Sequence, residues 1–131
     1  MKLLLDTHVL IWHVKAIPKL SAVATALLTD PANERFLSMA SVWEIAIKVG
    51  LKKLTLSSPI DQFMADAVSL YQIAVLNIRT DDCAAYEQLP FPNPNHRDPF
   101  DRMIVVHASR NGLSLVSADA AFDAYGVTRL W

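Results

Sequence analysis

Short apolar runs alternate along this chain with segments in which apolar residues recur at helical spacing. Five of the runs are candidate strands, at residues 2–6, 35–39, 74–78, 113–119 and 127–131. Runs of this length are typical of strands that are buried on both faces of a parallel sheet. The pattern therefore predicts an α/β fold with a mainly parallel central sheet and helices on both of its faces.

The segments between the runs carry the start and stop signals of helices. We expect helices at residues 7–14, 21–30, 41–54, 58–71, 81–89, 98–112 and 120–125. Thr7 and Ser41 are candidate N-caps, and Asp98 followed by a proline is the pattern of a cap and a first helical turn. Residues 90–96 hold three prolines and two asparagines, which predicts a loop. No repeat or linker interrupts the pattern, so we expect one domain over residues 1–131.

Composition and charge narrow the class of protein. A hydrophobic share of 53% with 19% charged residues excludes a disordered chain. The net charge of -1 excludes an overall basic field, so an anionic substrate needs a local basic patch or a bound metal. The lone Cys83 cannot form an internal disulfide, and no apolar run approaches the roughly 18 residues of a membrane span. We expect a cytoplasmic protein without a membrane partner.

Two acids stand where predicted strands end. Asp6 closes the first run, and Asp119 closes the run at 113–119. Because the carboxyl ends of parallel strands meet at one edge of a sheet, both side chains are expected at that edge. Each acid alone is equally well explained as a cap of the helix that follows.

Glu44 lies in a predicted helix that is apolar nearly all round. Such a helix is usually buried, which would bury Glu44, and a buried carboxylate needs a cation or several hydrogen-bond donors. The alternative is a pair with Lys48 at i,i+4, which contributes about 0.3 to 0.5 kcal/mol on a helix surface. The neighbouring Trp43 is expected in the core.

Asp101 lies in the first turn of the helix that Asp98 is expected to cap, where the helix dipole favours a negative charge. The face of Asp101 continues through three apolar residues, Ile104, Val105 and Ala108. Asp101 is therefore expected to point toward the core side, at the helix end that opens onto the strand edge.

Asp6, Glu44, Asp101 and Asp119 come from four separate elements that this topology can bring to one edge. Two carboxylates about 5 Å apart repel by roughly 3 kcal/mol at an effective dielectric near 20, so four together need a compensating charge. A cluster of oxygen ligands is what Mg²⁺ or Mn²⁺ prefers. Such a metal can activate water and stabilise a phosphoryl transition state, which predicts a metal-dependent phosphodiesterase.

Four stretches in order resemble the successive motifs of a PIN domain, and specifically of its VapC-type toxin branch. They are "LLLDTHVLIW", "SVWEIAIKVGLKKL", "HRDPFDRMIVVHA" and "LSLVSADAAFDAYGV". The resemblance implies a three-layer α/β/α sandwich and a Mg²⁺- or Mn²⁺-dependent endoribonuclease. It matches Asp6, Glu44 and Asp101 with the family's central acids. For the more variable fourth acid it leaves Asp119 and Asp123, of which we choose Asp119 because it follows the strand directly, while Asp123 is expected to face solvent. Asp98 is an additional acid, either at the rim of the site or only a cap.

The resemblance suggests a division of roles among the acids. Our hypothesis is that Asp6 and Asp101 hold the principal metal, while Glu44 completes its surroundings and helps to orient a nucleophilic water. Asp119 would bind a second metal, if one binds. Attack by water leaves a 5′-phosphate and a 3′-hydroxyl on the RNA.

Polar neighbours of the acids are candidates for accessory roles. Thr7 and Ser117 are expected to orient carboxylates or water, and Ser117 departs from the threonine that relatives often have at its position. Arg97 and Arg102 either hold the RNA backbone or pair with Asp98.

The resemblance also implies two protein partners, and other functions remain open. The partners are a small antitoxin, whose basic C-terminal arm enters the acidic site, and a second copy in a homodimer. One alternative is a catalytically weak RNA-binding or scaffold module, which a missing central acid would favour, but none is missing. Another is a phosphatase of the haloacid dehalogenase kind, which needs a second acid two residues after Asp6, where His8 stands.

Overall fold

The computed structural model describes residues 1–131 and is built around a five-stranded sheet in which all neighbouring strands are parallel. The strands are β1 (Lys2–Leu5), β2 (Glu34–Ser38), β3 (Ile73–Leu76), β4 (Ser114–Val116) and β5 (Arg129–Leu130), in the spatial order β3-β2-β1-β4-β5. β1 lies in the middle, and its three leucines are completely buried. β1 is apolar on both faces because both faces of the sheet are covered.

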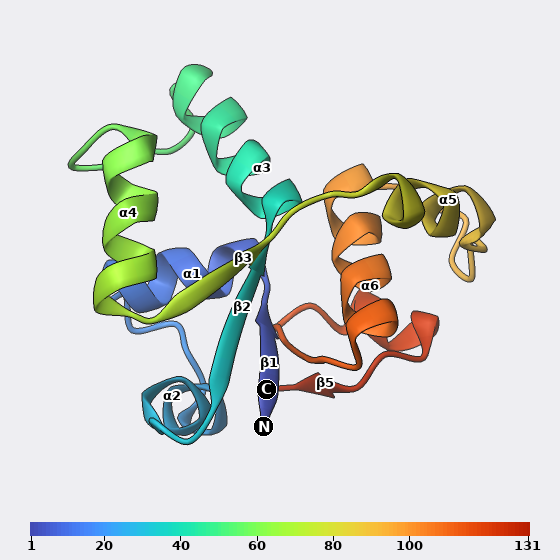
Figure 1. Cartoon of the computed structure of the whole chain (residues 1–131), viewed down its shortest axis with the longest axis horizontal. Helices are drawn as coiled ribbons and strands as arrows, with labels where there is room; N and C mark the ends of the chain where they lie inside the picture. Colours follow the sequence, from blue (N-terminus) through green and yellow to red (C-terminus); the bar gives the residue numbers. More distant parts are fainter.

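Helices cover the two faces of the sheet (Figure 1). They are α1 (Thr7–Val14), α2 (Ala22–Thr29), α3 (Met39–Gly50), α4 (Ile60–Leu70), α5 (Thr80–Gln88), α6 (Pro99–Asn111) and a 3₁₀ helix, η1 (Ala120–Tyr125). Side chains from α1, α2, α3 and α4 pack with Leu3 and Leu5 in one core. Side chains from α6 and η1 pack with Leu4 in a second core on the other face. This arrangement confirms the predicted α/β/α sandwich, and none of its helices has the length and apolar content to cross a membrane.

Two predicted caps are wrong, for the same reason. α3 begins at Met39 rather than at Ser41, because β2 runs directly into it and Ser38 acts as the cap, accepting the backbone N–H of Ala40 at 3.1 Å. α1 likewise follows β1 without a loop, so Thr7 is already the first helical residue and Asp6 occupies the N-cap position without a side-chain capping bond. Where a strand leads straight into a helix, the cap falls at the last strand residue or the one after it.

The position predicted for Trp43 also differs from the structure. Its side chain is 61% exposed, whereas α3 buries Ala40, Ser41 and Ile45. The exposed indole packs edge-to-face on Phe100 of α6, with ring centroids 5.3 Å apart. The expectation that Trp43 lies in the core is therefore wrong.

Candidate metal centre

Asp6 is held at the carboxyl edge of the sheet by two hydrogen bonds to the neighbouring strand segment. Its backbone N–H donates to Val116 at 3.1 Å, and its Oδ2 accepts the Ser117 hydroxyl at 2.7 Å. Burial raises the pKa of the Asp6 carboxyl, the Ser117 hydrogen bond opposes this rise, and the negative charge of Glu44 adds to it. Asp6 is therefore a buried carboxylate that hydrogen bonds from the Ser117 hydroxyl and the Thr7 backbone compensate only in part.

Asp101 lies in the first turn of α6, and Asp98 caps that turn. Asp98 Oδ1 accepts the backbone N–H groups of Phe100 and Asp101 at 2.9 and 3.0 Å. Burial and the charges of Asp98 and Asp6 raise the pKa of Asp101 to about 7, although His96 donates to it. The structure thus shows Asp98 as a helix cap whose charge also acts on Asp101.

Asp119 follows β4 and caps η1, where its Oδ1 accepts the backbone N–H of Ala121 at 2.9 Å. The same residue is tied to Asp6, because the Ser117 hydroxyl accepts the Asp119 N–H at 3.0 Å while donating to Asp6. A ring nitrogen of His96 and one carboxylate oxygen each of Asp101 and Asp119 all lie within 4.8 Å of one another. Asp119 therefore belongs to the same centre as Asp6 and Asp101.

Glu44 shows both features that the sequence left as alternatives: it is largely buried near another acid, and it pairs with Lys48. It forms the i,i+4 pair with Lys48 at 3.2 Å, and its side chain is only 12% exposed. Its charge contributes to the raised pKa of Asp6, so the two carboxylates interact. α3 thus places Glu44 close enough for its charge to act on Asp6, with Lys48 paired beside it.

The predicted accessory hydroxyls differ in what they contact. The Ser117 hydroxyl donates to the Asp6 carboxylate, which is the kind of contact that the sequence predicts for it. The Thr7 hydroxyl instead donates to Ser41 at 2.9 Å in a buried contact that joins α1 to α3. The expectation that the Thr7 hydroxyl orients a carboxylate is wrong, and its contribution to Asp6 comes from its backbone N–H.

Arg102 does not face the acids. Its side chain is 1% exposed, and the guanidinium donates to the backbone carbonyls of Pro90 and Leu89 at 2.9 and 2.8 Å. The ring of Phe91 stacks 3.7 Å from the guanidinium carbon. The expectation that Arg102 contacts RNA or pairs with Asp98 is therefore wrong. Arg97 is exposed, and its Nε donates to the carbonyl of Pro94 at 2.9 Å.

His96 is the member of the centre to which the sequence analysis gave no role. It lies in the loop before α6, with its Nε2 3.0 Å from Asp101 Oδ2. The only sequence signal was its place five residues before Asp101, and proximity in sequence does not fix where a loop side chain points.

The residues of this centre fit a divalent cation. No lysine or arginine nitrogen lies within 4 Å of the carboxylates of Asp6, Asp101 or Asp119. Burial first, and then the neighbouring negative charges, raise the pKa values of Asp6 and Asp101. Carboxylate oxygens are the ligands that Mg²⁺ and Mn²⁺ take.

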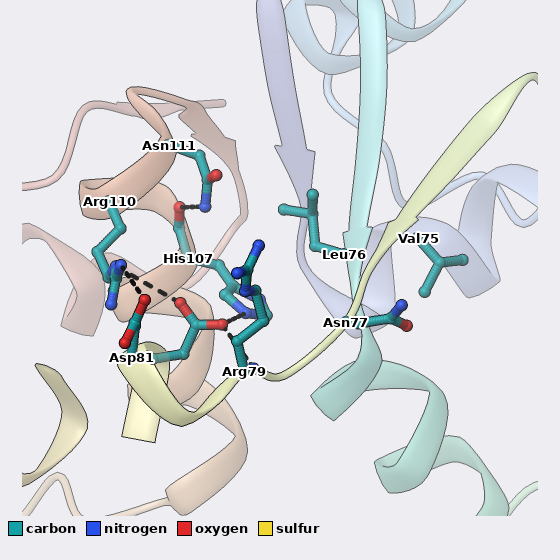
Figure 2. A pocket seen from close by; sticks show the side chains of 9 residues that line it. Val75, Leu76, Asn77, Arg79, Asp81, His107, Arg110 and Asn111 are labelled. Atoms are coloured by element: carbon teal, nitrogen blue, oxygen red, sulfur yellow. Dashed lines mark hydrogen bonds and ion pairs between the residues drawn. The ribbon is translucent and has the colours of Figure 1, made fainter. Parts of the chain in front are cut away.

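A polar cavity of about 420 Å³ elsewhere in the molecule contains acids whose charges are compensated (Figure 2). Its buried Asp82 accepts from His107 at 3.3 Å, with Arg110 3.5 Å away. Burial would raise the pKa of Asp82, but the backbone N–H of Arg79 and the His107 ring outweigh it, so the pKa is lowered. None of the four candidate acids lines this cavity, which is therefore not the site that the sequence predicts.

Comparison with known proteins connects this geometry to a family. The family model of the PIN domain matches residues 3–127. No curated protein sequence matches the chain.

Solved structures are similar over nearly the whole chain. VapBC2 from Rickettsia felis, bound to a promoter DNA fragment, gives a TM-score of 0.73 at 15% identity, covering 99% of this chain and 98% of that one. FitAcB from Neisseria gonorrhoeae gives 0.64 at 22%, covering 98% and 96%. VapC20 from Mycobacterium tuberculosis, described as a toxin that cleaves the sarcin–ricin loop, gives 0.69 at 15%, covering 96% of both chains. At these identities the likeness shows a common fold.

Proposed function

Since this chain belongs to the PIN domain family, we propose that it is a metal-dependent endoribonuclease that acts as the toxin of a toxin–antitoxin pair. The observation that carries the proposal is that Asp101 and Asp119 lie together beside Asp6, with no lysine or arginine paired to these carboxylates and only His96 in contact with Asp101. A carboxylate cluster of this kind is costly unless a cation binds there.

Each acid has a distinct place in the proposed site. Asp6 and Asp101 hold Mg²⁺ or Mn²⁺, Glu44 completes the surroundings and orients the attacking water, and Asp119 serves a second cation if one binds. A cation bound there lowers the pKa of water and offsets the charge of the phosphoryl transition state. The oxygen of water joins phosphorus and O3′ departs, so the products carry a 5′-phosphate and a 3′-hydroxyl.

The substrate class is supported by the family and by one neighbour. VapC20, which shares the fold, is described as cleaving the sarcin–ricin loop. Of the two arginines beside the acids, Arg97 is exposed and is the one that we propose to contact an RNA phosphate. The chain itself carries no general basic field, so such contacts are local.

The partners are proposed from neighbours and from exposed apolar surface. Four of the similar structures are described as VapBC, which supports an antitoxin that binds this chain in the cytoplasm. Three apolar residues are exposed along α3 and at its C-terminal end. They are Trp43 (61%) and Ile47 (37%) in the helix and Leu51 (60%) directly after it. Apolar side chains gathered on one segment favour a protein interface, and we propose a homodimer or the antitoxin as its occupant.

The competing function is a catalytically weak PIN-fold module that binds RNA or acts as a scaffold. The presence of all four acids, with raised pKa values at Asp6 and Asp101, argues against it. A module that had lost catalysis would be under no constraint to keep repelling charges together.

The deciding experiment is cleavage of labelled structured RNAs by purified, antitoxin-free protein in Mg²⁺, in Mn²⁺ and in EDTA. The Asp101→Asn variant is compared with Glu34→Gln, an exposed acid at the opposite end of the parallel strands. We expect cutting at defined positions that EDTA and Asp101→Asn abolish and Glu34→Gln leaves intact. Cutting that persists in EDTA and in Asp101→Asn would overturn the proposal, and RNA binding without any cutting would favour the module.

A further inference from the structure

His96 is engaged through both of its ring nitrogens by residues from two different elements. Nε2 lies 3.0 Å from Asp101 Oδ2 on α6, and Nδ1 lies 2.8 Å from the hydroxyl of Tyr125 at the end of η1. The imidazole also packs edge-to-face on Phe122 and Tyr125, with centroids 6.1 and 5.5 Å apart, and its side chain is 12% exposed. The ring is therefore fixed in place by contacts on its faces and on both nitrogens.

The direction of these hydrogen bonds follows from a third residue. Nη1 of the buried Arg102 lies 3.4 Å from the Tyr125 hydroxyl, and a guanidinium can only donate. Tyr125 therefore accepts from Arg102 and keeps its own proton for an acceptor. The nearest acceptor is His96 Nδ1, since the carbonyl of His96 is 3.4 Å away.

This direction sets the tautomer of the imidazole. If Nδ1 accepts from Tyr125, the proton of the neutral ring is on Nε2, and Nε2–H points at Asp101 Oδ2. When the Asp101 carboxylate is ionised it can only accept, so in that state the Asp101 end of the chain of bonds has the same direction. A nitrogen that carries a proton has no lone pair for a cation. His96 is thus unsuited as a ligand, although its Nε2 lies near Asp101 and Asp119.

We propose that His96 is a positioning residue for Asp101, and that Tyr125 and Arg102 hold its tautomer. His96 fixes one carboxylate oxygen, Oδ2, and leaves the other free to face a cation. The proposal rests on the proposed function in one respect, namely that Asp101 is the metal ligand. It also explains why Arg102 is buried next to the site: it joins the loop after α5 to the residues that orient Asp101.

The arrangement is built from segments far apart in the chain. The loop that carries His96 is tied to α6 through Arg102 and the carbonyls of Leu89 and Pro90. η1 is anchored by the fully buried Phe122, and it places Tyr125 against the other side of the imidazole. Partners of metal ligands generally fix the ligand's orientation in this way, and their loss typically lowers metal affinity about 10- to 100-fold.

The first test needs no metal. Long-range ¹H–¹⁵N NMR spectra of the imidazoles distinguish the two neutral tautomers, and the His96 signals are assigned by their loss in His96→Gln. We expect the Nε2–H tautomer in the wild-type protein and a smaller excess of it in Tyr125→Phe, where only the contact with Asp101 still favours it. Tyr86→Phe is the matched control, because the Tyr86 ring also lies 5.2 Å from the Arg102 guanidinium carbon but its hydroxyl is outside this chain of bonds. A dominant Nδ1–H tautomer in the wild-type protein would overturn the proposal.

The second test measures Mn²⁺ binding by calorimetry and by pulsed electron paramagnetic resonance. We expect His96→Ala to weaken Mn²⁺ binding about 10- to 100-fold and His96→Gln to restore much of it, because the glutamine amide can donate from nearly the same place. The bound Mn²⁺ is expected to show no directly coordinated nitrogen. Direct coordination of nitrogen, or equal affinity in His96→Ala, contradicts the proposal. If the wild-type protein binds no Mn²⁺, the proposed function fails, while the tautomer experiment still decides the role of His96.

Discussion

The Ser117 hydroxyl donates a 2.7 Å hydrogen bond to Asp6 Oδ2, and both side chains are buried. The two residues end adjacent parallel strands, whose last paired residues are Leu5 and Val116. The bond therefore crosses the sheet at the edge where the acids converge. It is the one side-chain hydrogen bond that the Asp6 carboxylate receives, and it opposes the rise in pKa that burial causes.

Removing this donor is expected to weaken both the fold and the site. Ser117→Ala leaves a buried carboxylate without its donor, which should lower the free energy of unfolding at pH 8 by about 1 to 3 kcal/mol. Ser117→Thr keeps the hydroxyl and is the matched control. Urea denaturation at pH 8 measures the difference. Equal losses in the two variants would mean that packing, rather than the hydrogen bond, is responsible.

The pKa of Asp101, raised to about 7, makes the metal-free protein less stable at alkaline pH. An unfolded aspartate titrates near 4, so between pH 4 and 7 the folded state binds more protons and the free energy of unfolding falls as pH rises. After allowing for solvent screening, we expect Asp101 to contribute a loss of about 2 kcal/mol between pH 5 and 8; the raised pKa of Asp6 adds to this loss and the lowered pKa of His13 opposes it. Denaturation at both pH values, in EDTA, measures it.

Asp101→Asn isolates this effect, because the amide does not titrate. Metal-free Asp101→Asn should be more stable than the wild-type protein at pH 8 and close to it at pH 5. The acids with lowered pKa values, Asp82 and Asp123, are ionised in both folded and unfolded states above pH 5, so they do not contribute in this window. A wild-type protein that is as stable as the variant at pH 8 would contradict a raised pKa at Asp101.

The sequence predicts the parts of this molecule that local patterns determine. The strands and α6 are marked by apolar runs, by the Asp98–proline pattern and by Gly112, which adopts the left-handed conformation at the end of the helix. The convergence of the acids follows from topology, because Asp6 and Asp119 each follow a parallel strand. The elements are signalled by neighbouring residues, and the convergence of the acids follows once the strands are known to be parallel.

What the sequence does not predict depends on how a loop lies over a helix. Asp101 and Arg102 are adjacent, but consecutive helical residues point about 100° apart, so one faces the acids and the other faces the loop at residues 89–98. The carbonyls of that proline-rich loop need donors, and Arg102 supplies them. Trp43 beside Glu44 is the same case on α3: one side chain turns to the centre and the other to solvent.

Binding of a divalent cation is expected to reverse the pH effect. At pH 8 a cation at 100 times its dissociation constant stabilises the folded state by about 2.7 kcal/mol. Mg²⁺ and Mn²⁺ should therefore raise the melting temperature of the wild-type and Glu34→Gln proteins, and have little effect on Asp6→Asn. Thermal denaturation at increasing metal concentration measures this. A shift that survives in Asp6→Asn would locate the cation elsewhere.

Substitution of Arg102 is expected to lower the stability of the fold, whereas substitution of Arg97 is expected to weaken RNA binding. In Arg102→Lys, the single ammonium group lacks the planar guanidinium that donates to two loop carbonyls, so the free energy of unfolding should fall by about 2 to 4 kcal/mol.

Arg97→Ala removes an exposed side chain and should change the free energy of unfolding by less than about 0.5 kcal/mol. It should instead weaken RNA binding and reduce the dependence of that binding on salt, because one phosphate contact is lost. Urea denaturation and binding of a labelled RNA at two salt concentrations test both variants, with catalysis blocked by EDTA. An Arg102→Lys protein of wild-type stability would contradict the structural role of Arg102, and an Arg97→Ala protein with unchanged salt dependence would remove Arg97 from the RNA interface.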